Sequence, residues 1–578
     1  MSADSYTELR EERIGTESVD VSMYTRNNRA FTEQNNDLYL NMNKNFGTDG
    51  EISFSGLLGY NQRRSSFQSI YASTNGGLVV PGVYALSNSV AAPAAPSEGS
   101  NTIGVDGIYG QASIGYQNFL YVDLSARQDV SSTLPVENNT YFYPAASLSL
   151  IWSEFVDSDI LSFGKIRANW ANVGSDATAN ALVDAYGIGT PFNGTTLASA
   201  PSTQNNSMLL PENTASTELG LEVKLFDNRF GFDVSAYQRS TTNQILPAQV
   251  STATGTYFKY VNAGQVDNQG FEVSSYITPV KTKDFQWDVN INWSTNDNTV
   301  VSLFGDSESL LLGSVQGGVN MTARVGESYG TLEGTQYVRA GGDGAPLVYD
   351  WASSRGGARY YTGDVGVIGN VQADWRGGIN NAISYKNVRL SALVDAQWGG
   401  NFFSLDTYYG YGTGVYDFQA GTNAAGNPIR TNVEDGGGLT FEEVAYLGIE
   451  TPQQWDGVTV DADGNPVGTA NSTPMWMNDY GNAMGWALGG PKEMHIHDAS
   501  FVKLREVALT YSLPTSALAG LPVAGVDVSF IGRNLAILYK NTPWSDPEAG
   551  LAAGNLQGYQ SGAYPTLREV GVNLRVKF

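Results

Sequence analysis

Segments that alternate apolar and polar residues recur along almost the whole of this chain. In FQWDVNINW, residues 285–293, the aromatic and aliphatic side chains fall on one face and the Gln, Asp and Asn side chains on the other. Roughly 15 such segments follow one another from Asp37 to Phe578, most of them longer than an average strand. Tight turns separate neighbouring segments, as at Asn118 and Asn387. The sequence therefore predicts an all-β, antiparallel fold in which consecutive strands pair with each other.

The composition agrees with strands joined by polar turns and loops. The 578 residues include 66 Gly, 32 Tyr and 23 Phe, and only 15% are charged, against about a quarter in an average soluble domain. No run of about 18 apolar residues occurs, so no transmembrane helix is expected, whereas a barrel strand crosses a bilayer with about ten alternating residues. The net charge of −25 disfavours nucleic acid as a partner. The absence of Cys excludes disulfide and thiolate chemistry.

Alternation alone does not say which face is outside. In a soluble sandwich the apolar face is buried, whereas in a membrane barrel it meets lipid and the polar face encloses a wet lumen. Aromatic residues at strand ends favour the barrel, because amphipathic rings gather at the membrane boundary; they are Tyr141, Phe142, Tyr143, Trp152, Trp287, Trp293, Trp375 and Trp398. Long connections at 64–107, 174–213, 304–335 and 402–493 contrast with short turns and predict a transmembrane β-barrel with long extracellular loops on one rim.

The end of the chain is the strongest single indication of a barrel. Val570, Val572, Leu574, Val576 and Phe578 alternate with polar residues or glycine, and the chain stops on the Phe. A barrel pairs its last strand with its first, because no open edge survives in lipid. We therefore expect these five residues to form the closing strand and to be the signal read by the barrel assembly machinery. The alternative is an ordinary edge strand of a soluble sheet.

Several motifs, in order along the chain, resemble the SusC/RagA family of TonB-dependent transporters. The run HDASFVKLREVALTYSLP, from His497, resembles the family's penultimate strand, and SDPEAG, from Ser545, resembles its Asp-Pro-Glu loop. YPTLREVGVNLRVKF resembles its closing strand. Earlier matches lie at residues 108–132, 143–154, 165–176, 217–246 and 262–273. The resemblance covers roughly residues 30–578, and this many motifs in register argue against chance.

The resemblance implies an importer in the outer membrane of a Gram-negative bacterium, with no enzymatic activity and no cofactor. It implies uptake of oligosaccharides or peptides with a SusD-like surface lipoprotein, driven by the TonB complex, in a barrel surrounded by outer-membrane lipid. The family barrel has about 22 strands, more than the roughly 15 seen here, and no signal peptide, N-terminal sandwich domain or plug is recognised. We therefore expect residues 1–578 to be the C-terminal part of a barrel, from a truncated or split transporter. The alternative is a secreted or surface all-β glycan-binding or adhesin protein without transport activity.

Ligand or partner contacts are expected on aromatic residues of the long loops. Tyr and Trp faces stack on sugar rings and apolar groups, and intervening glycines permit close approach. The candidates are Phe402, Phe403, Tyr408, Tyr409, Tyr411, Tyr416, Trp455, Trp476 and Trp544. The alternative is that these rings pack within the loops or against a partner. His495 and His497 would face one side of a strand, but no third ligand is marked, so no metal site or catalytic residue is expected.

Overall fold

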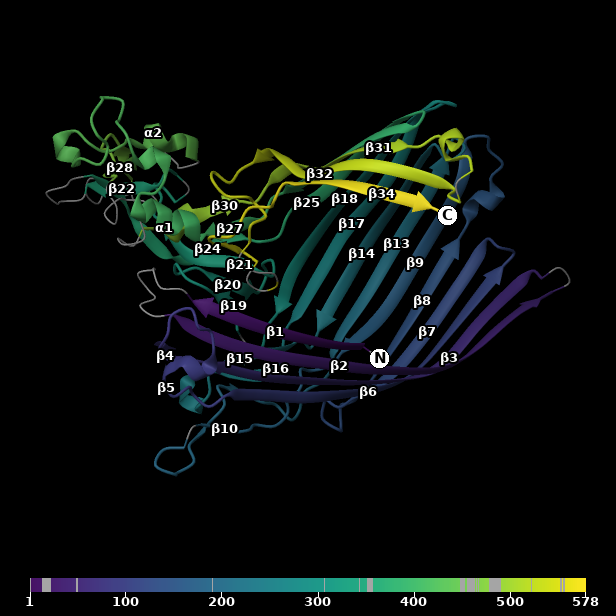
Figure 1. The fold of residues 1–578 in the computed structure, drawn as a ribbon, viewed down its shortest axis with the longest axis horizontal. Coiled ribbons are helices and arrows are strands. Elements are labelled where there is room, and N and C mark those ends of the chain that lie inside the picture. The colour runs from purple at the N-terminus through teal and green to yellow at the C-terminus, as the bar shows by residue number, and fades with distance from the viewer. Residues whose placement is uncertain are drawn as a thin grey trace.

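The dominant feature of the computed structural model is one 16-stranded antiparallel sheet (Figure 1). The structure describes residues 2–12, 22–47, 50–189, 191–305, 307–342, 344–350, 357–447, 453–454, 463, 465, 467–477, 490–520, 522–550, 554 and 557–578. The sheet runs in chain order through β1 (Ser2–Glu12), β2 (Met23–Phe46), β3 (Ile52–Ser73), β6 (Ser97–Tyr116), β7 (Leu120–Ser131), β8 (Thr140–Leu150), β9 (Leu161–Ser175), β13 (Glu212–Leu225), β14 (Phe230–Thr242), β17 (Gln265–Lys281), β18 (Phe285–Ser302), β25 (Trp375–Tyr385), β26 (Val388–Trp398), β31 (Phe501–Ser512), β32 (Gly525–Lys540) and β34 (Glu569–Lys577).

All of the strands expected from alternation are present in this sheet, so the antiparallel all-β prediction is confirmed. The additional strand is β1, which pairs with Met23–Glu33 of β2. Its sequence, SADSYTELREE, has no regular apolar alternation, and the pattern used to find strands therefore misses it. Its backbone pairing with β2 places the strand in the sheet.

The two faces of the sheet differ as the alternation predicts. On β18, Asp288 accepts a hydrogen bond from the Thr278 hydroxyl (2.9 Å) and lies 3.6 Å from the guanidinium of Arg389, whereas Ile291 and Trp293 are exposed on the opposite face. Similar interstrand hydrogen bonds join polar side chains of the same face along the sheet, and several of these side chains are buried. Side chains crowd together on the concave face of a curved sheet, so the polar face is the concave one and the apolar face points outward.

Short turns and long connections lie at opposite rims of the sheet, as expected (Figure 1). The short turns use left-handed residues such as Asn118 (φ 59°) and Asn228 (φ 63°), which suits the tight reversal. At the long-loop rim, the rings of Trp375 and Trp398 stack with centroids 6.3 Å apart, and Tyr539 stacks on Trp398 at 5.7 Å. This row of rings lies at strand ends, where an interfacial aromatic belt belongs.

One expected connection is shorter than the sequence suggests. Residues 64–107 were expected to form a loop, but β3 continues to Ser73 and β6 begins at Ser97. The two strands pair without interruption from Arg64↔Gly104 to Tyr71↔Ser97. Polar and small residues dominate these extensions, so they carry no apolar stripe to mark them as strands. The loop prediction is therefore wrong at both of its ends.

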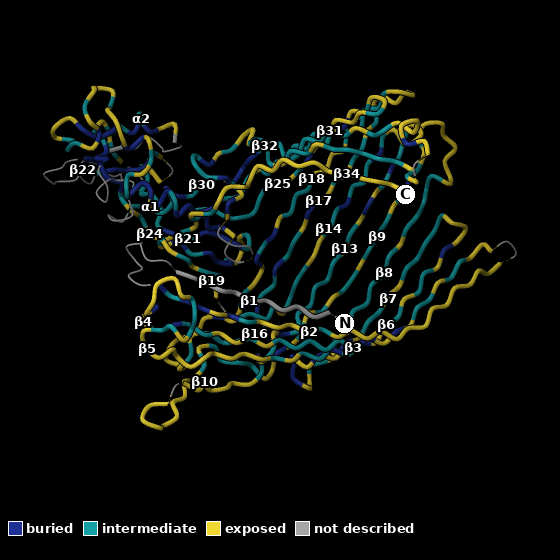
Figure 2. The backbone as a smooth tube through the Cα atoms, in the orientation of Figure 1, coloured by how far each residue is buried: buried dark blue, intermediate teal, exposed yellow. Residues whose placement is uncertain are grey.

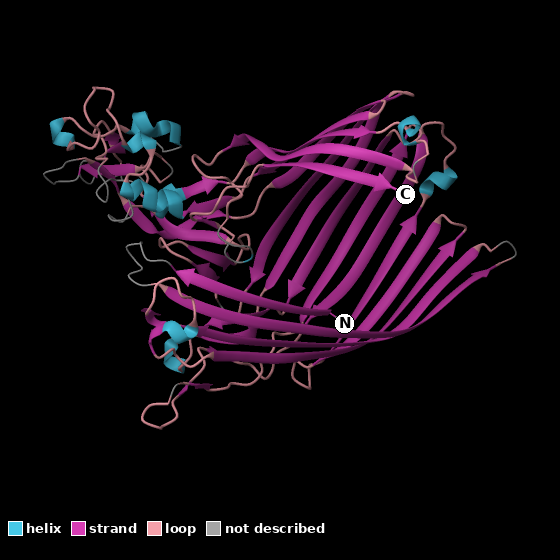
Figure 3. Cartoon of the chain, viewed as in Figure 1, coloured by secondary structure: helices cyan, strands magenta, loops and turns pink. Residues whose placement is uncertain are grey.

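The connections contain small sheets and short helices of their own (Figure 3). The further strands are β4 (Asn75–Leu78), β5 (Ser89–Ala91), β10 (Gly187–Ile188), β11 (Ala198–Ser199), β12 (Thr203–Gln204), β15 (Ile245–Gln249), β16 (Phe258–Asn262), β19 (Ser309–Ser314), β20 (Asn320–Arg324), β21 (Thr331–Tyr337), β22 (Leu347–Asp350), β23 (Ala358–Tyr360), β24 (Thr362–Asn370), β27 (Asn401–Ser404), β28 (Gln453–Gln454), β29 (Thr469–Ala470), β30 (Ile496–Asp498) and β33 (Tyr559–Gln560). The α-helices are α1 (Leu405–Thr413) and α2 (Phe441–Val444). No helix in the described part of the chain has the length and apolar character needed to cross a bilayer.

The last strand lies at one edge of the sheet. β34 pairs antiparallel with β32, and its outward side chains Val570, Val572, Leu574 and Val576 share one face, followed by exposed Phe578. Figure 2 shows β34 exposed along its length. Among the described residues the order of the sheet ends with β1 at one edge and β34 at the other, so the expected pairing of last and first strands is not seen. The assembly-signal role of these residues stays a prediction.

Candidate functional site

Three long connections pack together at the long-loop rim and form what we call the loop module: the described residues of 303–374, 399–500 and 541–568 (Figure 1). Backbone pairing joins them, because β22 of the first connection pairs with β28 of the second, and β27 of the second pairs with β33 of the third. The first connection contributes the sheet β19-β20-β21-β24. These segments, far apart in sequence, therefore form one folded body.

The loop module has two apolar cores. One gathers Val319, Met321, Leu332, Phe403, Leu405, Tyr408 and Tyr559, and thus contains residues from all three connections. The other gathers Val348, Ala358, Tyr360, Tyr411, Phe418, Ile429, Leu439, Phe441, Val444, Met475, Met477 and Met494. Figure 2 shows the buried residues concentrated at this end of the molecule. Cores of this size give the connections a fixed shape, unlike loops that merely link strands.

Helix α1 carries several of the candidate aromatic residues into these cores. The Ser404 hydroxyl caps the helix by accepting from the Thr407 backbone N–H (3.1 Å), and Gly414, with φ 69°, ends it. The short helix places Tyr408 and Tyr411 inward, where burial raises the pKa of both phenols. Neither ring presents an open face to solvent.

The two histidines meet at one hydroxyl group. The Thr407 Oγ1 lies 3.2 Å from His495 Nδ1 and 3.2 Å from His497 Nε2, and it donates to the Ser404 carbonyl at 3.1 Å. With its only proton used in this way, the hydroxyl oxygen accepts an N–H from each ring. Burial lowers the pKa of His497 to about 4 and that of His495 well below 6.5, so both rings are neutral near pH 7.

Tyr416 and Trp544 form a stacked pair between the second and third connections. Their ring centroids are 4.1 Å apart, and Phe418 stacks on Trp544 at 5.6 Å. Both Tyr416 and Trp544 line a pocket of about 480 Å³, together with Asp406 and Tyr409. Burial raises the pKa of Tyr416 to about 12, so its hydroxyl stays protonated. This pocket combines ring surfaces with a carboxylate, which suits a ligand with apolar and hydroxyl groups.

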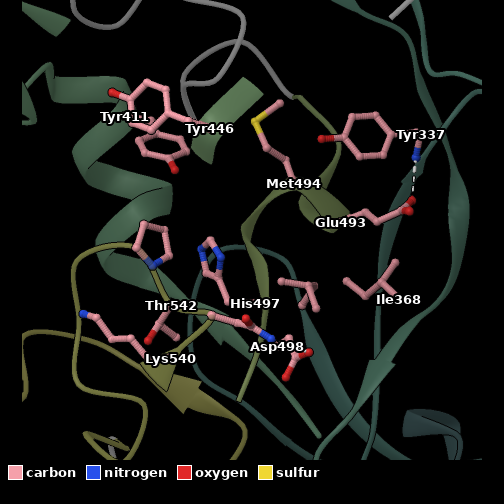
Figure 4. Close-up of a pocket in the computed structure, with 13 residues that line it drawn as sticks. Tyr337, Ile368, Tyr411, Tyr446, Glu493, Met494, His497, Asp498, Lys540 and Thr542 are labelled. Atoms are coloured by element: carbon pink, nitrogen blue, oxygen red, sulfur yellow. Dashed lines mark hydrogen bonds between the residues drawn. The ribbon is translucent and has the colours of Figure 1, made fainter. Parts of the chain in front are cut away.

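A larger pocket of about 760 Å³ opens where all three connections meet (Figure 4). Figure 4 shows Tyr411 and Tyr446 at one end and Glu493 with Tyr337 at the other. Glu493, in the short helix Lys492–His495, accepts from the Tyr337 backbone N–H (2.9 Å) and pairs with Arg339 (2.8 Å).

The remaining side of this pocket carries polar groups of both signs. Asp498, on β30, accepts from the Asn541 side chain at 2.8 Å, and Lys540, at the end of β32, donates to the Ser545 carbonyl at 2.9 Å. His497 also lines the pocket. Ring surfaces, donors and acceptors therefore converge on one concave site. Such a set can hold a polar organic ligand without performing covalent chemistry on it.

The candidate aromatic residues divide into two groups. Buried in the interior of the loop module are Phe402, Phe403, Tyr408, Tyr411 and Trp476, although Tyr411 also reaches the edge of the larger pocket. Accessible on the smaller pocket are Tyr409, Tyr416 and Trp544. Trp455 lies outside the described residues. The ligand role of these residues stays a prediction, and geometry favours the second group.

The sequence did not single out Glu493, Asp498 and Lys540 as site residues. Asp498 lies inside the HDASF motif, and this motif was the one sequence feature that could have drawn attention to it. The motif does not reveal that the Asp498 carboxylate accepts a hydrogen bond from Asn541, which lies far away in the sequence. Among the described residues no group of three His, Cys, Asp or Glu side chains is placed to hold a metal ion. The histidines share a threonine hydroxyl instead.

Comparison with known proteins identifies a family and several relatives to which this chain is similar. Residues 4–392 match the family described as TonB dependent receptor-like, beta-barrel. TonB-dependent receptor P3 of Formosa agariphila is 24% identical over 575 residues, covering 93% of this chain and 52% of the relative. TonB-dependent receptor SusC of Bacteroides thetaiotaomicron is 24% identical over 426 residues, covering 70% of this chain and 37% of SusC.

A solved structure of the RagAB peptide transporter superposes with a TM-score of 0.71 at 18% identity, covering 100% of this chain and 59% of that chain. This likeness shows a common fold. The chain thus spans about half the length of the relatives that it matches. The expected resemblance to SusC and RagA is confirmed. The chain belongs to the TonB-dependent receptor-like β-barrel family, a family of transporters and receptors in the outer membrane of Gram-negative bacteria.

Proposed function

We propose that this chain is the C-terminal part of the barrel of an outer-membrane importer. The importer takes up oligosaccharides or peptides together with a SusD-like surface lipoprotein, with energy from the TonB complex. The observation that carries this proposal is the loop module itself: three connections build a folded body at one rim, with a pocket of about 760 Å³ where they meet. A bare structural barrel has no need of such a body.

The directions of the edge strands and the unpaired part of β2 are compatible with the assignment to part of a barrel. β2 and β34 both run from the long-loop rim toward the short-turn rim. A closed antiparallel barrel therefore needs an odd number of strands between them, and β1 supplies one. β1 pairs with Met23–Glu33, and within the described part of the chain no strand pairs with the outer edge of residues 34–46. An even number of further strands would close the barrel and cover these edges.

The pocket linings support a polar organic cargo. Stacked Tyr416 and Trp544 offer ring surface, while Asp498, Lys540 and Glu493 offer charged groups of both signs. Sugars use ring stacking and hydroxyl hydrogen bonds, and peptides use backbone amides and both charges. The two pockets are suited to both classes, so the cargo is to be decided by experiment.

A gene deletion in the source bacterium tests the import function. The mutant is grown with defined oligosaccharides or defined peptides as sole nutrient, and uptake of each labelled compound is measured. Import predicts loss of growth and uptake on one class, restored by the intact gene. Normal uptake of both classes, combined with loss of surface attachment, would favour the adhesin alternative instead.

The partner is tested by affinity purification from outer membranes in mild detergent. We expect one surface lipoprotein to co-purify in equal amount. A Trp544→Ala variant tests the pocket, and Trp170→Ala, on the outward face of β9, provides a matched loss of an exposed indole outside the module. We expect reduced uptake for the first and unchanged uptake for the second. Equal uptake by both variants would remove the smaller pocket from the import path.

A further inference from the structure

The sequence contains two Asn-Gly steps, and the fold places them in different surroundings. Asn193-Gly194 lies in the connection between β9 and β13, whereas Asn75-Gly76 lies at the start of β4. An Asn followed by Gly is chemically reactive, because the glycine nitrogen has no neighbouring side chain to hinder its attack on the Asn side-chain carbon. Structure that keeps the two groups apart prevents this attack, so the surroundings decide which step reacts.

Asn193 and Gly194 form the exposed tip of the small hairpin of β10 and β11. Both residues have left-handed backbone angles, with φ 48° and 78°, and the Phe192–Thr195 bridge closes the turn with hydrogen bonds of 3.0 and 2.9 Å. Within the described residues, neither the Asn193 side chain nor the Gly194 N–H makes a hydrogen bond. No atom lies within 4 Å of the position that a Cβ on Gly194 would take. The two reacting groups therefore have room to move.

Little structure supports this tip. β10 and β11 are each 2 residues long, and residues 183–189 and 191–200 are exposed. An isolated two-stranded hairpin is marginally stable at best in water, and exposed loops open locally at a free-energy cost close to zero. Opening releases Asn193 from the turn, so that its side-chain carbon comes within reach of the Gly194 nitrogen.

Asn75 is held from several directions. The Ser89 hydroxyl accepts from the Asn75 N–H at 2.8 Å and donates to the Asn75 carbonyl at 3.1 Å. The Asn75 side chain donates to the Ala92 carbonyl at 3.1 Å. A Cβ on Gly76 would meet Val90 at 3.7 Å, so this step packs against β5. The amide group and the backbone of Asn75 are thus both fixed.

The chain on either side of Asn75 is also tied down. The Thr74 N–H donates to the Tyr24 carbonyl of β2 at 2.9 Å, and the Leu78 N–H donates to the Ser22 carbonyl at 2.8 Å. Thr74 and Leu78 are buried. Opening this segment would break buried contacts with the large sheet, which costs more than opening the hairpin tip.

We propose that Asn193 is a self-modification site that converts to aspartate and isoaspartate, and that the fold protects Asn75. The Gly194 nitrogen bonds to Asn193 Cγ while the Cγ–Nδ2 bond breaks. The proton of the Gly194 N–H passes through solvent to the departing nitrogen, which leaves as ammonia. Water then opens the cyclic imide: breaking its bond to Cγ gives aspartate, and breaking its bond to the main-chain carbonyl carbon gives isoaspartate. Water is the co-reactant, and nothing is oxidised or reduced.

Either product changes the tip of the hairpin. A carboxylate replaces a neutral amide beside Phe192, whose side chain is 68% exposed. Isoaspartate also inserts a methylene into the main chain, so the turn that closes at the Phe192–Thr195 bridge loses its geometry. A neutral tip with an exposed ring thus becomes charged and irregular. This inference is independent of import and of the cargo.

The test follows both steps in the full chain, folded in detergent micelles. The protein is kept in mildly alkaline heavy-oxygen water, digested, and analysed by mass spectrometry with electron-transfer fragmentation, which separates aspartate from isoaspartate. Because the new carboxylate takes an oxygen from the solvent, the label distinguishes conversion in the folded chain from conversion during digestion. We expect roughly tenfold more conversion at Asn193 than at Asn75. Equal conversion at the two steps would overturn the proposal.

Variants and unfolding test whether the fold sets this difference. Ser89→Ala removes the hydroxyl that holds Asn75 and should raise conversion there about three- to tenfold. Ser158→Ala removes a hydroxyl that accepts two backbone N–H groups between β8 and β9, and it should leave both steps unchanged. In the urea-unfolded chain the two steps should convert at similar rates. The same ratio before and after unfolding would assign the difference to local sequence and contradict protection by the fold.

Discussion

The side-chain ammonium of Lys503 on β31 lies 2.5 Å from a carboxylate oxygen of Asp546, in the connection between β32 and β34, and both side chains are almost fully buried. The same ammonium lies 2.5 Å from Glu548, and the Thr566 hydroxyl donates to Asp546 at 2.6 Å. Burial alone would raise the pKa of Asp546, but the hydrogen bonds from Lys503 and Thr566 outweigh burial and hold this pKa well below its usual range. One buried cation thus ties the third connection to the sheet.

Replacing Lys503 should release this connection. Lys503→Met leaves Asp546 without its cation, whereas Glu548 keeps its pair with Arg505, and breaking a buried pair in this way costs about 3–5 kcal/mol. We expect faster amide hydrogen exchange in residues 541–568, measured by mass spectrometry near pH 7. Arg533→Met is the control, because its pair with Glu506 is exposed and contributes at most about 1 kcal/mol. Equal exchange in the two variants would show that the buried pair does not hold the connection.

This ion pair illustrates what a sequence can and cannot predict. The SDPEAG and HDASFVKL motifs mark both partners as unusual, and period-two alternation locates every strand with an apolar stripe. Neither pattern states that Lys503 and Asp546 meet, because 43 residues separate them and the contact depends on how the connection folds back. For the same reason β1, which lacks a stripe, and the polar extensions of β3 and β6 escape prediction.

The loop module should lose stability in mild acid because of the two histidines. Burial lowers the pKa of His497 to about 4 and that of His495 well below 6.5, whereas in the unfolded chain both take up a proton near pH 6.5. The unfolded state therefore binds more protons below this pH, and stability falls as pH drops from about 6.5 toward 4. Hydrogen exchange in residues 401–413 and 490–500, corrected for intrinsic rates, should rise across this window.

Replacing the two imidazole rings with amide side chains separates the pH dependence caused by the histidines from that caused by carboxylates. In the double variant His495→Asn, His497→Gln, an N–H remains at the positions of Nδ1 and Nε2, but neither group titrates. The chain has 2 His in all, so the pH dependence between about 4 and 6.5 should disappear. Retention of the full dependence in the double variant would assign it to carboxylates instead.

Thr407 should be more important to the loop module than an ordinary surface threonine. Thr407→Val keeps the shape but leaves two imidazole N–H groups and the Ser404 carbonyl without the shared hydroxyl. An unsatisfied buried polar group costs about 1–3 kcal/mol, and the thermal midpoint of the module should fall accordingly. Thr413→Val, at the exposed end of α1, removes a hydroxyl whose hydrogen bond within the described residues goes to the Tyr409 carbonyl, and it should change little. Identical midpoints would contradict the shared-hydroxyl arrangement.

The aromatic candidates show why the site is harder to predict than the fold. A run such as FFSLDTYYGYG signals that rings matter, but ring-rich sequence is equally suited to a core and to a binding surface. Only the packing of three connections decides that Phe403 is enclosed while Tyr409 and Trp544 reach a pocket. The charged pocket residues Glu493, in the second connection, and Lys540, at the end of β32, are far apart in the sequence, so no local pattern could join them.

The last strand provides a direct test of which face meets lipid. Val572 lies outward on β34 beside Phe530, whereas the next residue, Asn573, faces the polar side beside Ser529. A lysine on the lipid face of a barrel costs about 2–4 kcal/mol near the bilayer midplane, while a lysine on the lumen side is tolerated. Val572→Lys should therefore reduce the amount of protein recovered in outer-membrane fractions, and Asn573→Lys should not. The opposite result would mean that the apolar stripe of β34 is not its lipid-facing side.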